Sequence, residues 1–98
     1  MGHQITYSHP SVQKEINSWP SEIRAKYAHI TEAMCQENPN LGRPYTKPVR
    51  KKLFEIRINK KHRVLFKCNG QEIRLLHAFV KRENQISKPD IDVALSRE

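Results

Sequence analysis

The sequence contains no long apolar run. No stretch of its 98 residues approaches the roughly 20 consecutive apolar residues that a membrane-spanning helix needs. The first ten residues, MGHQITYSHP, have neither the basic nor the apolar region of a secretory signal peptide. We therefore expect a cytoplasmic protein that does not interact with membranes.

Cysteine is scarce as well. Cys35 and Cys68 fall in different predicted elements and lack the CxxC spacing of zinc-binding or redox sites. Reduced thiols without a role are the expectation, because disulfides are rare in the cytosol. A chain of this length buries roughly 60–70 % of its unfolded surface and can fold without a disulfide or a metal. The sequence predicts a single domain over residues 1–98 with no metal and no cofactor.

Acidic residues are nearly missing from the middle of the chain. Residues 43–82 contain 13 basic residues and only two acidic ones, Glu55 and Glu72. The formal net charge of +8 for the whole chain understates this concentration. A positive field of this kind attracts phosphate backbones or an acidic partner. Lysines kept for solubility are the simpler alternative, but arginines inside strand patterns are not a routine means of keeping a protein soluble.

The first half of the chain predicts a short strand and two helices. Residues 4–8 alternate like a short edge strand. Ser11 can cap the first helix, and Pro20 can open the second, which continues until residues 37–42, ENPNLG, break the pattern. The apolar positions of these helices are Val12, Ile16, Trp19, Ile23, Tyr27, Ile30 and Met34.

The second half predicts strands and one more helix. Residues 47–52, KPVRKK, form a basic lead-in. Three predicted strands follow, at about residues 53–59, 62–68 and 72–80. Residues 87–97, SKPDIDVALSR, predict a short last helix with Ser87 and Asp90 at the spacing of a capping box.

The hairpin between the last two strands determines which way the side chains point. Asn69-Gly70 predicts a two-residue type I′ turn that pairs Cys68 with Gln71. Alternation then assigns every strand residue to a core side or to a second side. The core side receives Phe54, Ile56, Ile58, His62, Val64, Phe66, Ile73, Leu75, His77 and Phe79. The second side receives Glu55, Arg57, Arg63, Leu65, Leu76, Ala78, Val80 and Arg82.

One sheet face is therefore expected to carry Arg57, Arg63 and Arg82 over an apolar floor. Guanidinium groups from different strands can hold a phosphate by bidentate hydrogen bonds and stabilise the charge that develops on it. This is what cleavage or transfer of a phosphodiester requires. Cross-strand pairs with Glu55 and Glu72 are the structural alternative, but two acids are too few for the bases on this face.

Three segments, KLFEIRI, HRVLF and LLHAFVKR, resemble in order and spacing the HigB-like branch of the RelE/ParE toxin superfamily. The resemblance extends from about Val12 to Arg97. It implies an α+β fold of two N-terminal helices packed on one face of a small antiparallel sheet, with a short C-terminal helix. It also implies a toxin that cleaves mRNA on the translating 70S ribosome, and a cognate antitoxin, typically a HigA-like helix-turn-helix protein. The family's basic active-site positions correspond here to Arg57, Arg63, Lys81 and Arg82.

The chain departs from that family after FVKR. The family commonly continues through a lysine, a threonine and a proline, whereas this chain has Gln85, Ile86 and Ser87, with Pro89 displaced. Some members of the superfamily use a tyrosine near the C-terminus, and no aromatic residue follows Phe79 here.

The predicted reaction is attack by an RNA 2′-OH on the adjacent phosphate, giving a 2′,3′-cyclic phosphate and a 5′-OH. The three arginines would clamp the phosphate, and Lys81 could donate to it or to the leaving group. Glu55 is one candidate base, although pairing with Arg57 is favoured, and His62 is another. His77 is expected to be a core histidine. The other bases expected to bind RNA are Lys47, Arg50, Lys51, Lys52, Lys60, Lys61, Lys67 and Arg74.

Two other functions stay open at this point. The same fold could inhibit DNA gyrase without catalysis, as ParE-like toxins do. It could also be an RNA-binding module without chemistry, although the sequence predicts no exposed aromatic platform for bases. An antitoxin could lay an acidic amphipathic helix over Leu65, Leu76 and Val80, or it could dock against the N-terminal helices.

Overall fold

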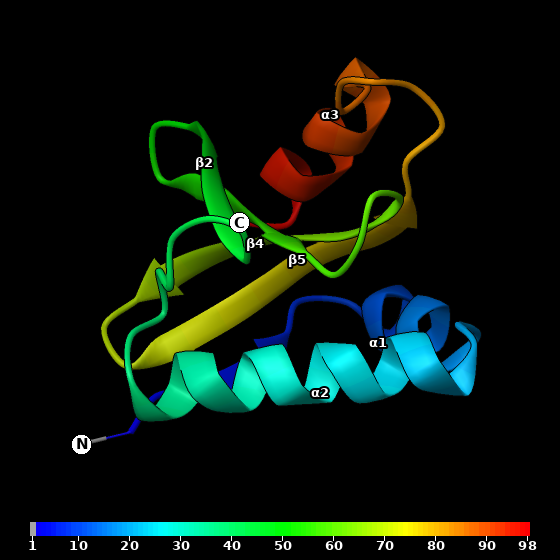
Figure 1. The fold of residues 1–98 in the computed structure, drawn as a ribbon. Coiled ribbons are helices and arrows are strands. Elements are labelled where there is room, and N and C mark those ends of the chain that lie inside the picture. Colours follow the sequence, from blue (N-terminus) through cyan, green and yellow to red (C-terminus); the bar gives the residue numbers. More distant parts are fainter. Residues whose placement is uncertain (1) are drawn as a thin grey trace.

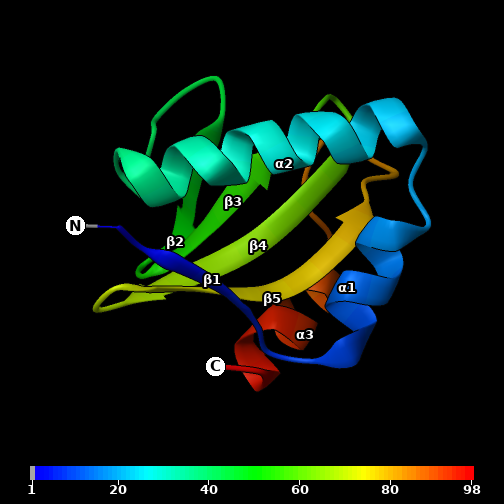
Figure 2. The same cartoon turned by 90° about the horizontal axis from the view of Figure 1, so that it is seen from below.

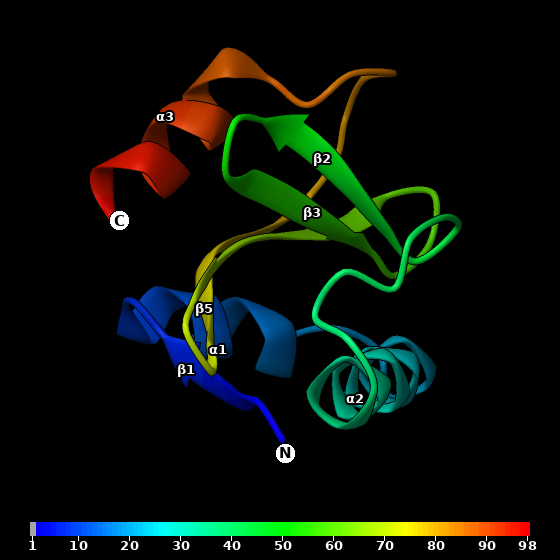
Figure 3. The same cartoon turned by 90° about the vertical axis from the view of Figure 1, so that its left-hand side faces the viewer.

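The computed structural model describes residues 2–98. A five-stranded sheet lies between two layers of helices, with α1 and α2 on one face and α3 on the other (Figure 1). The same three layers are visible from the side in Figure 3. The elements in chain order are β1 (Gln4–Tyr7), α1 (Pro10–Asn17), α2 (Ser21–Gln36), β2 (Thr46–Arg50), β3 (Leu53–Arg57), β4 (His62–Asn69), β5 (Glu72–Val80) and α3 (Lys88–Ser96). The predicted α+β class is confirmed.

The two N-terminal helices lie on the same face of the sheet at a large angle to one another, with α1 next to β5, as Figure 2 shows from that side. The start of α1 differs from the prediction: Pro10 is the first helical residue, and His9 is the cap. The ring Nδ1 of His9 accepts a hydrogen bond from the backbone N–H of Ser11 at 3.1 Å. Proline suits this position because its missing N–H would have no partner in the first turn. Pro20 was predicted to open the second helix, and it occupies the cap position directly before α2.

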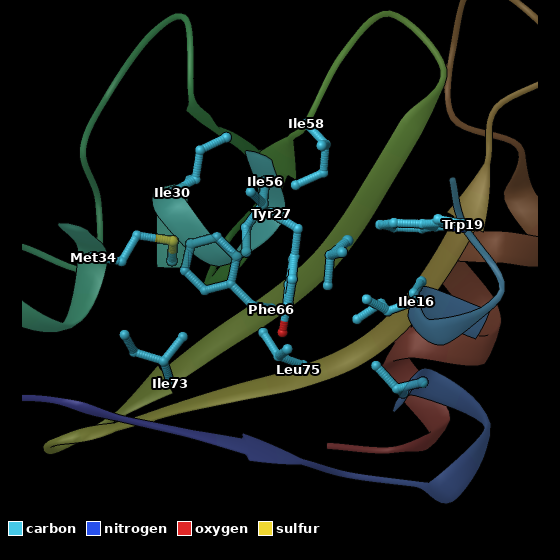
Figure 4. Close-up of a cluster of buried hydrophobic side chains, with 13 residues drawn as sticks. Ile16, Trp19, Tyr27, Ile30, Met34, Ile56, Ile58, Phe66, Ile73 and Leu75 are labelled. Atoms are coloured by element: carbon cyan, nitrogen blue, oxygen red, sulfur yellow. The ribbon is translucent and has the colours of Figure 1, made fainter. Parts of the chain in front are cut away.

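The predicted apolar positions of the helices form the main core (Figure 4). They pack against the sheet side chains that were assigned to the core side, except His77 and Phe79. The largest fully buried side chains of this main core are Phe66, Met34, Ile56, Ile58, Ile73 and Leu75. A second, smaller core lies under α3 on the opposite face, and its buried members are Leu53, Leu65, Leu76, Phe79 and Ala94. Burial on both faces explains the uninterrupted apolar run Val64, Leu65 and Phe66 in the middle of β4.

The sheet order is β1-β5-β4-β3-β2, with β1 parallel to β5 and the other pairs antiparallel. The predicted edge strand near the N-terminus is thus confirmed. The sequence missed β2, because residues 47–52 were interpreted as a basic lead-in. Pro48 is tolerated there because β2 is an edge strand. A proline whose missing N–H would point to the open edge removes no hydrogen bond between strands.

The β4–β5 hairpin departs from its predicted register. Asn69 pairs with Glu72, so the turn residues are Gly70 and Gln71 instead of Asn69 and Gly70. Gly70 has φ +63°, and it is the only turn residue with positive φ, which fits a type II′ turn with glycine first. The shift amounts to two residues, so the faces stay as predicted up to Leu75.

A β-bulge beyond that point reverses the later assignments. Leu75 pairs with Phe66 and His77 with Leu65, so Leu76 is the extra residue. From there on the alternation changes phase. His77 and Phe79 face α3, whereas the predictions placed them with the main core. Ala78 joins the main core, whereas the prediction placed it on the arginine face.

The bulge and α3 together change the expected surface. Leu65 and Leu76, predicted as an open floor, are covered by α3 and have no exposed area. Val80 pairs with His62 and therefore points away from that floor. Ser87 caps α3, its side chain accepting from the N–H of Asp90 as predicted. Among residues 2–98, no helix is long and apolar enough to cross a membrane.

Candidate functional site

Two arginines lie side by side across adjacent strands. Arg57, at the end of β3, pairs in register with Arg63 near the start of β4. Alternate residues of a strand face the same side, so both share the α3 face of the sheet with Glu55. The odd-numbered loop of residues 59–61 produces this register, and the backbone N–H of Ile58 closes it by donating to the carbonyl of His62 at 3.1 Å. This part of the predicted arrangement is confirmed.

Arg63 is buried, and its guanidinium donates in three directions within the protein. Nη1 donates to a carboxylate oxygen of Glu55 at 3.1 Å, Nε to the carbonyl of Asn59 at 3.1 Å, and Nη2 to the carbonyl of Lys60 at 2.9 Å. Both Arg63 and Glu55 are 3 % exposed. The expected pairing of Glu55 with Arg57 is therefore wrong, because the long side chain of Arg63 reaches its diagonal neighbour across the sheet. Arg63 ties the β3–β4 turn to the sheet.

An open cleft of about 420 Å³ lies beside this buried pair. We call it the cationic cleft, and its charged lining residues are Lys47, Glu55, Arg57, Arg63 and Lys81. They come from β2, β3, β4 and the chain just beyond β5. Residues 84–86, which follow β5, and Ile91 of α3 complete the lining. Among residues 2–98, Lys47, Arg57 and Lys81 take part in no ion pair.

The ammonium group of Lys81 has a lowered pKa. Desolvation lowers the pKa of Lys81 below its ordinary value of 10.5, and the positive charges of Arg63, Arg57 and Lys47 lower it further. Glu55 acts in the opposite direction with a smaller effect than Arg63. A lysine in such surroundings gives up a proton more readily than an ordinary lysine. Lys81 is therefore suited to protonating a leaving group.

Arg82 does not line the cationic cleft. It is exposed beyond the end of β5 and lines a second cleft of about 510 Å³, which we call the β5-end cleft. The predicted trio of arginines on one floor is therefore wrong, because the strand ends at Val80 and the bulge at Leu76 has already changed the alternation. Lys81 and Gln85 line both clefts, so this segment borders both hollows.

His77 lines the β5-end cleft with a carboxylate partner. Its Nε2 lies 2.8 Å from an oxygen of Asp90 in α3, and its ring stacks on Phe79 with centroids 5.0 Å apart. The other oxygen of Asp90 accepts a hydrogen bond from the hydroxyl of Ser87 at 2.7 Å. The prediction of a core histidine under the N-terminal helices is wrong, since the bulge turns His77 toward α3.

His62 lies on the opposite face of the sheet from Arg63. Its ring packs edge-on against Trp19 at 4.9 Å between centroids, and Nδ1 lies 3.1 Å from the side-chain oxygen of Asn59. Desolvation lowers the pKa of His62; Glu15 raises it and Lys61 lowers it by smaller amounts. The structure therefore separates this candidate base from the cationic cleft.

The other predicted RNA-binding residues are distributed around the molecule. Lys60 and Lys61 are exposed on the β3–β4 turn. Lys67 pairs with Glu98 at 2.9 Å, and Arg74 lies 3.6 Å from Glu72. A third hollow near the end of α3 is lined by four of these bases, which are Arg50, Lys51, Lys52 and Lys67. Of the predicted RNA-binding residues, only Lys47 lines the cationic cleft.

Tyr45 is a residue of this region that the sequence reasoning missed. It is 44 % exposed, and its carbonyl accepts a hydrogen bond from the backbone N–H of Arg57 at 2.8 Å. Tyr45 therefore stands opposite Arg57 on the face that also carries Lys47. The available signal was the run of β-favouring Tyr45, Thr46 and Val49. The expectation that no aromatic platform is exposed is thus wrong.

Comparison with known protein families gives a direct match. Residues 14–98 match the family described as "Phage derived protein Gp49-like (DUF891)". The chain belongs to the Gp49-like family. No curated protein matches it.

The fold of this Gp49-like protein is similar to that of solved toxin structures. The archaeal RelE–RelB complex from Pyrococcus horikoshii matches with a TM-score of 0.71 and 16 % identity, covering 83 % of this chain and 97 % of that chain. The YoeB/ParE toxin from Agrobacterium tumefaciens matches with 0.68 and 13 %, covering 81 % and 99 %. The YoeB–YefM complex from Staphylococcus aureus matches with 0.66 and 12 %, covering 84 % and 100 %. At these identities the similarity establishes the fold.

Proposed function

We propose that this Gp49-like protein is the toxin of a HigB-like toxin–antitoxin pair and that it cleaves mRNA on the translating ribosome. The observation that carries the proposal is the cationic cleft. Lys47, Arg57 and Lys81 converge on it from three separate segments and form no ion pair among residues 2–98. Unpaired cations brought together by a fold are what a phosphodiester needs for binding and for charge stabilisation.

The roles within the cleft follow from the accessibility of each group. Arg57 is part-exposed and unpaired, so it can bind the scissile phosphate with both guanidinium branches. Lys47 adds a point charge from the neighbouring strand, and Lys81 supplies a proton to the departing 5′-oxygen. Arg63 acts through position, since its donors already hold Glu55 and the β3–β4 turn. Glu55, buried against Arg63, does not serve as the base.

The surroundings of the cleft suit a single RNA strand. Tyr45 has an exposed side chain, and its backbone is hydrogen-bonded to that of Arg57. Bases stack on exposed aromatic rings with little sequence preference. Lys60 and Lys61, exposed on the neighbouring turn, extend the positive surface along the path of the backbone. The ribosome would hold the mRNA and supply part of the positioning.

A cognate antitoxin is part of the proposal. The similar structures include a RelE–RelB complex and a YoeB–YefM complex, and we expect a HigA-like helix-turn-helix protein here. In this chain α3 already covers Leu65 and Leu76, so this part of the sheet floor is not open to a partner helix. The outer surface of α1 and α2 is the docking site that fits the structure.

The test is inducible bacterial expression with mapping of the 5′ ends of cellular mRNA soon after induction. Wild type and Arg57→Ala are compared with Lys26→Ala, which removes an exposed charge on the outer side of α2. We expect wild type and Lys26→Ala to arrest growth with cuts at fixed positions within codons. Arg57→Ala should accumulate equally and lose the cuts. Western blotting checks that all three proteins are present.

Other outcomes separate the competing functions. Growth arrest with intact mRNA and damaged DNA would favour the gyrase inhibitor. Absence of arrest in all three strains would contradict the toxin proposal. Arrest and cuts that persist in Arg57→Ala would show that cleavage does not depend on the cationic cleft.

A further inference from the structure

We infer that His77, oriented by Asp90, is the general base of the cleavage and that the reacting 2′-OH lies in the β5-end cleft. The inference rests on the proposed function and assigns the group that the cationic cleft lacks. Neither Glu55 nor His62 can fill this role, because Glu55 is buried against Arg63 and His62 faces the helices on the other side of the sheet.

The hydrogen bonds of His77 fix which ring nitrogen is free. Asp90 is an acceptor when ionised, so Nε2 of His77 donates to it across 2.8 Å. In the neutral ring Nδ1 then carries the lone pair, as carboxylate–imidazole pairs arrange in acid–base catalysis. Among residues 2–98, Nδ1 of His77 has no hydrogen-bond partner. This atom is not fully buried. Since His77 lines the β5-end cleft, this nitrogen is the ring atom left to accept a proton there.

Asp90 is itself held in place, which keeps the imidazole in one orientation. Its second carboxylate oxygen accepts from the hydroxyl of Ser87 at 2.7 Å, and its backbone N–H donates to that hydroxyl at 3.3 Å. Phe79 supports the imidazole from one side, with an angle of 13° between the ring planes. A base with two supports and one open nitrogen is positioned before substrate arrives.

Charged groups from three segments face the same cleft. Asp90 comes from α3, Glu15 from α1, and the chain after β5 contributes Lys81, Arg82 and Glu83. Glu15 already accepts a hydrogen bond from the indole of Trp19 at 3.0 Å. The carboxylate of Asp90 is hydrogen-bonded to His77 and Ser87. Lys81 and Arg82 form no ion pair among residues 2–98. They can therefore hold the scissile phosphate beside the segment that borders both clefts.

The reaction step balances with these two groups. Nδ1 of His77 takes the proton of the 2′-OH while the 2′-oxygen forms a bond to phosphorus. The bond between phosphorus and the 5′-oxygen breaks, and that oxygen receives a proton from the ammonium of Lys81. The products are a 2′,3′-cyclic phosphate and a 5′-hydroxyl. Proton exchange with water restores both side chains, and no oxidation or reduction takes place.

The experiment measures single-turnover cleavage of mRNA in purified translating ribosomes saturated with the protein. His77→Gln is the main variant, because the amide nitrogen of glutamine can keep the hydrogen bond to Asp90 while the basic nitrogen is lost. His29→Gln, an exposed site on α2, is the matched control. General base catalysis contributes about 10²- to 10⁴-fold, so we expect His77→Gln to cleave at least about 100-fold more slowly. Affinity for ribosomes should not change.

Two further measurements separate catalysis from a purely structural tether between β5 and α3. Added imidazole should restore part of the cleavage by His77→Ala, since it can replace the missing base. Asp90→Asn should lower the saturated rate without lowering affinity for ribosomes. Thermal unfolding of every variant is followed in parallel, to identify any that do not fold.

The outcomes distinguish this inference from the proposed function. If wild type cleaves and His77→Gln cleaves within a few-fold of it, the base assignment is wrong and the proposed function stands. If the His77 variants are slow but imidazole restores nothing to a folded His77→Ala, the pair has a structural role only, which overturns the inference. If wild type does not cleave ribosome-bound mRNA, both fail.

Discussion

Arg57 and Arg63 are neighbours in register, yet they have different physical roles. Arg63 is 3 % exposed and donates to Glu55 and to two backbone carbonyls. Arg57 is part-exposed, lines the cationic cleft and takes part in no ion pair among residues 2–98. The sequence pattern shows that both side chains face the same side of the sheet. It cannot show which of the two is buried in an ion pair. Arg57 is therefore the arginine to which we assign the phosphate contact in the proposed function.

This difference predicts losses of stability of unequal size. Arg63→Ala would leave the carboxylate of Glu55 buried without its partner, and breaking a buried pair in this way costs about 3–5 kcal/mol. Arg57→Ala removes no ion pair among residues 2–98, so we expect a loss within about 1 kcal/mol. Urea unfolding followed by circular dichroism measures both free energies. Adding Glu55→Gln to Arg63→Ala should recover part of the loss by removing the buried charge.

Equal losses for the two arginine variants would contradict this division of roles. The comparison also decides how toxicity data can be interpreted. An inactive Arg63→Ala protein reports on folding as much as on chemistry, whereas an inactive Arg57→Ala protein that unfolds normally reports on the cleft.

At the scale of elements, the sequence predicted most of what local patterns determine. Apolar spacing located α2 and the three central strands, because burial on one or both faces leaves a clear period. The capping residues Ser87 and Asp90 located the start of α3 for the same local reason. The predicted edge strand at residues 4–8 also formed, although its parallel pairing with β5 could not be predicted from so short a segment.

The bulge at Leu76 is the feature that local patterns could not reveal. Leu75 and Leu76 are both fully buried, one in each core, and two successive leucines read equally well as part of a regular strand. Once one residue is inserted, every later side chain changes face. This single irregularity moved His77 into a cleft, and it also explains the wrong faces of Ala78 and Phe79.

The β4–β5 turn gives a prediction at this scale. Gly70 has φ +63°, and a Cβ there would meet no atom within 4 Å, so Gly70→Ala changes only the backbone preference. We expect a loss of about 1–2 kcal/mol, the cost of placing an L-residue in this region. Gly2→Ala is the control, because its Cβ would make an ordinary contact at 3.7 Å with the carbonyl of Cys35. Urea unfolding of the two variants gives the comparison, and a loss in Gly2→Ala as large as in Gly70→Ala would contradict it.

At the scale of the whole molecule, the positive charges differ in whether they form ion pairs. The formal net charge is +8, but the bases are not equivalent. Lys67, Arg74 and Lys88 lie next to acids on the same surface. Of the bases that line the cationic cleft, Lys47, Arg57 and Lys81 take part in no ion pair among residues 2–98. Composition alone predicts attraction to nucleic acid, whereas the three-dimensional pairing predicts which face is used.

Salt dependence of RNA binding tests this distinction. A lysine that contacts a phosphate releases counterions, so its removal should lower the slope of log affinity against log salt concentration by about 0.7–0.9. We expect that decrease for Lys47→Ala, which loses a charge of the cationic cleft. Lys88→Ala is the matched control, because Lys88 is exposed on α3 and pairs with Asp92 at 3.0 Å. Fluorescence anisotropy with a labelled single-stranded RNA, measured at several salt concentrations, gives both slopes. Equal slopes for the two variants would mean that RNA binds through the net charge of the molecule and not through the cationic cleft.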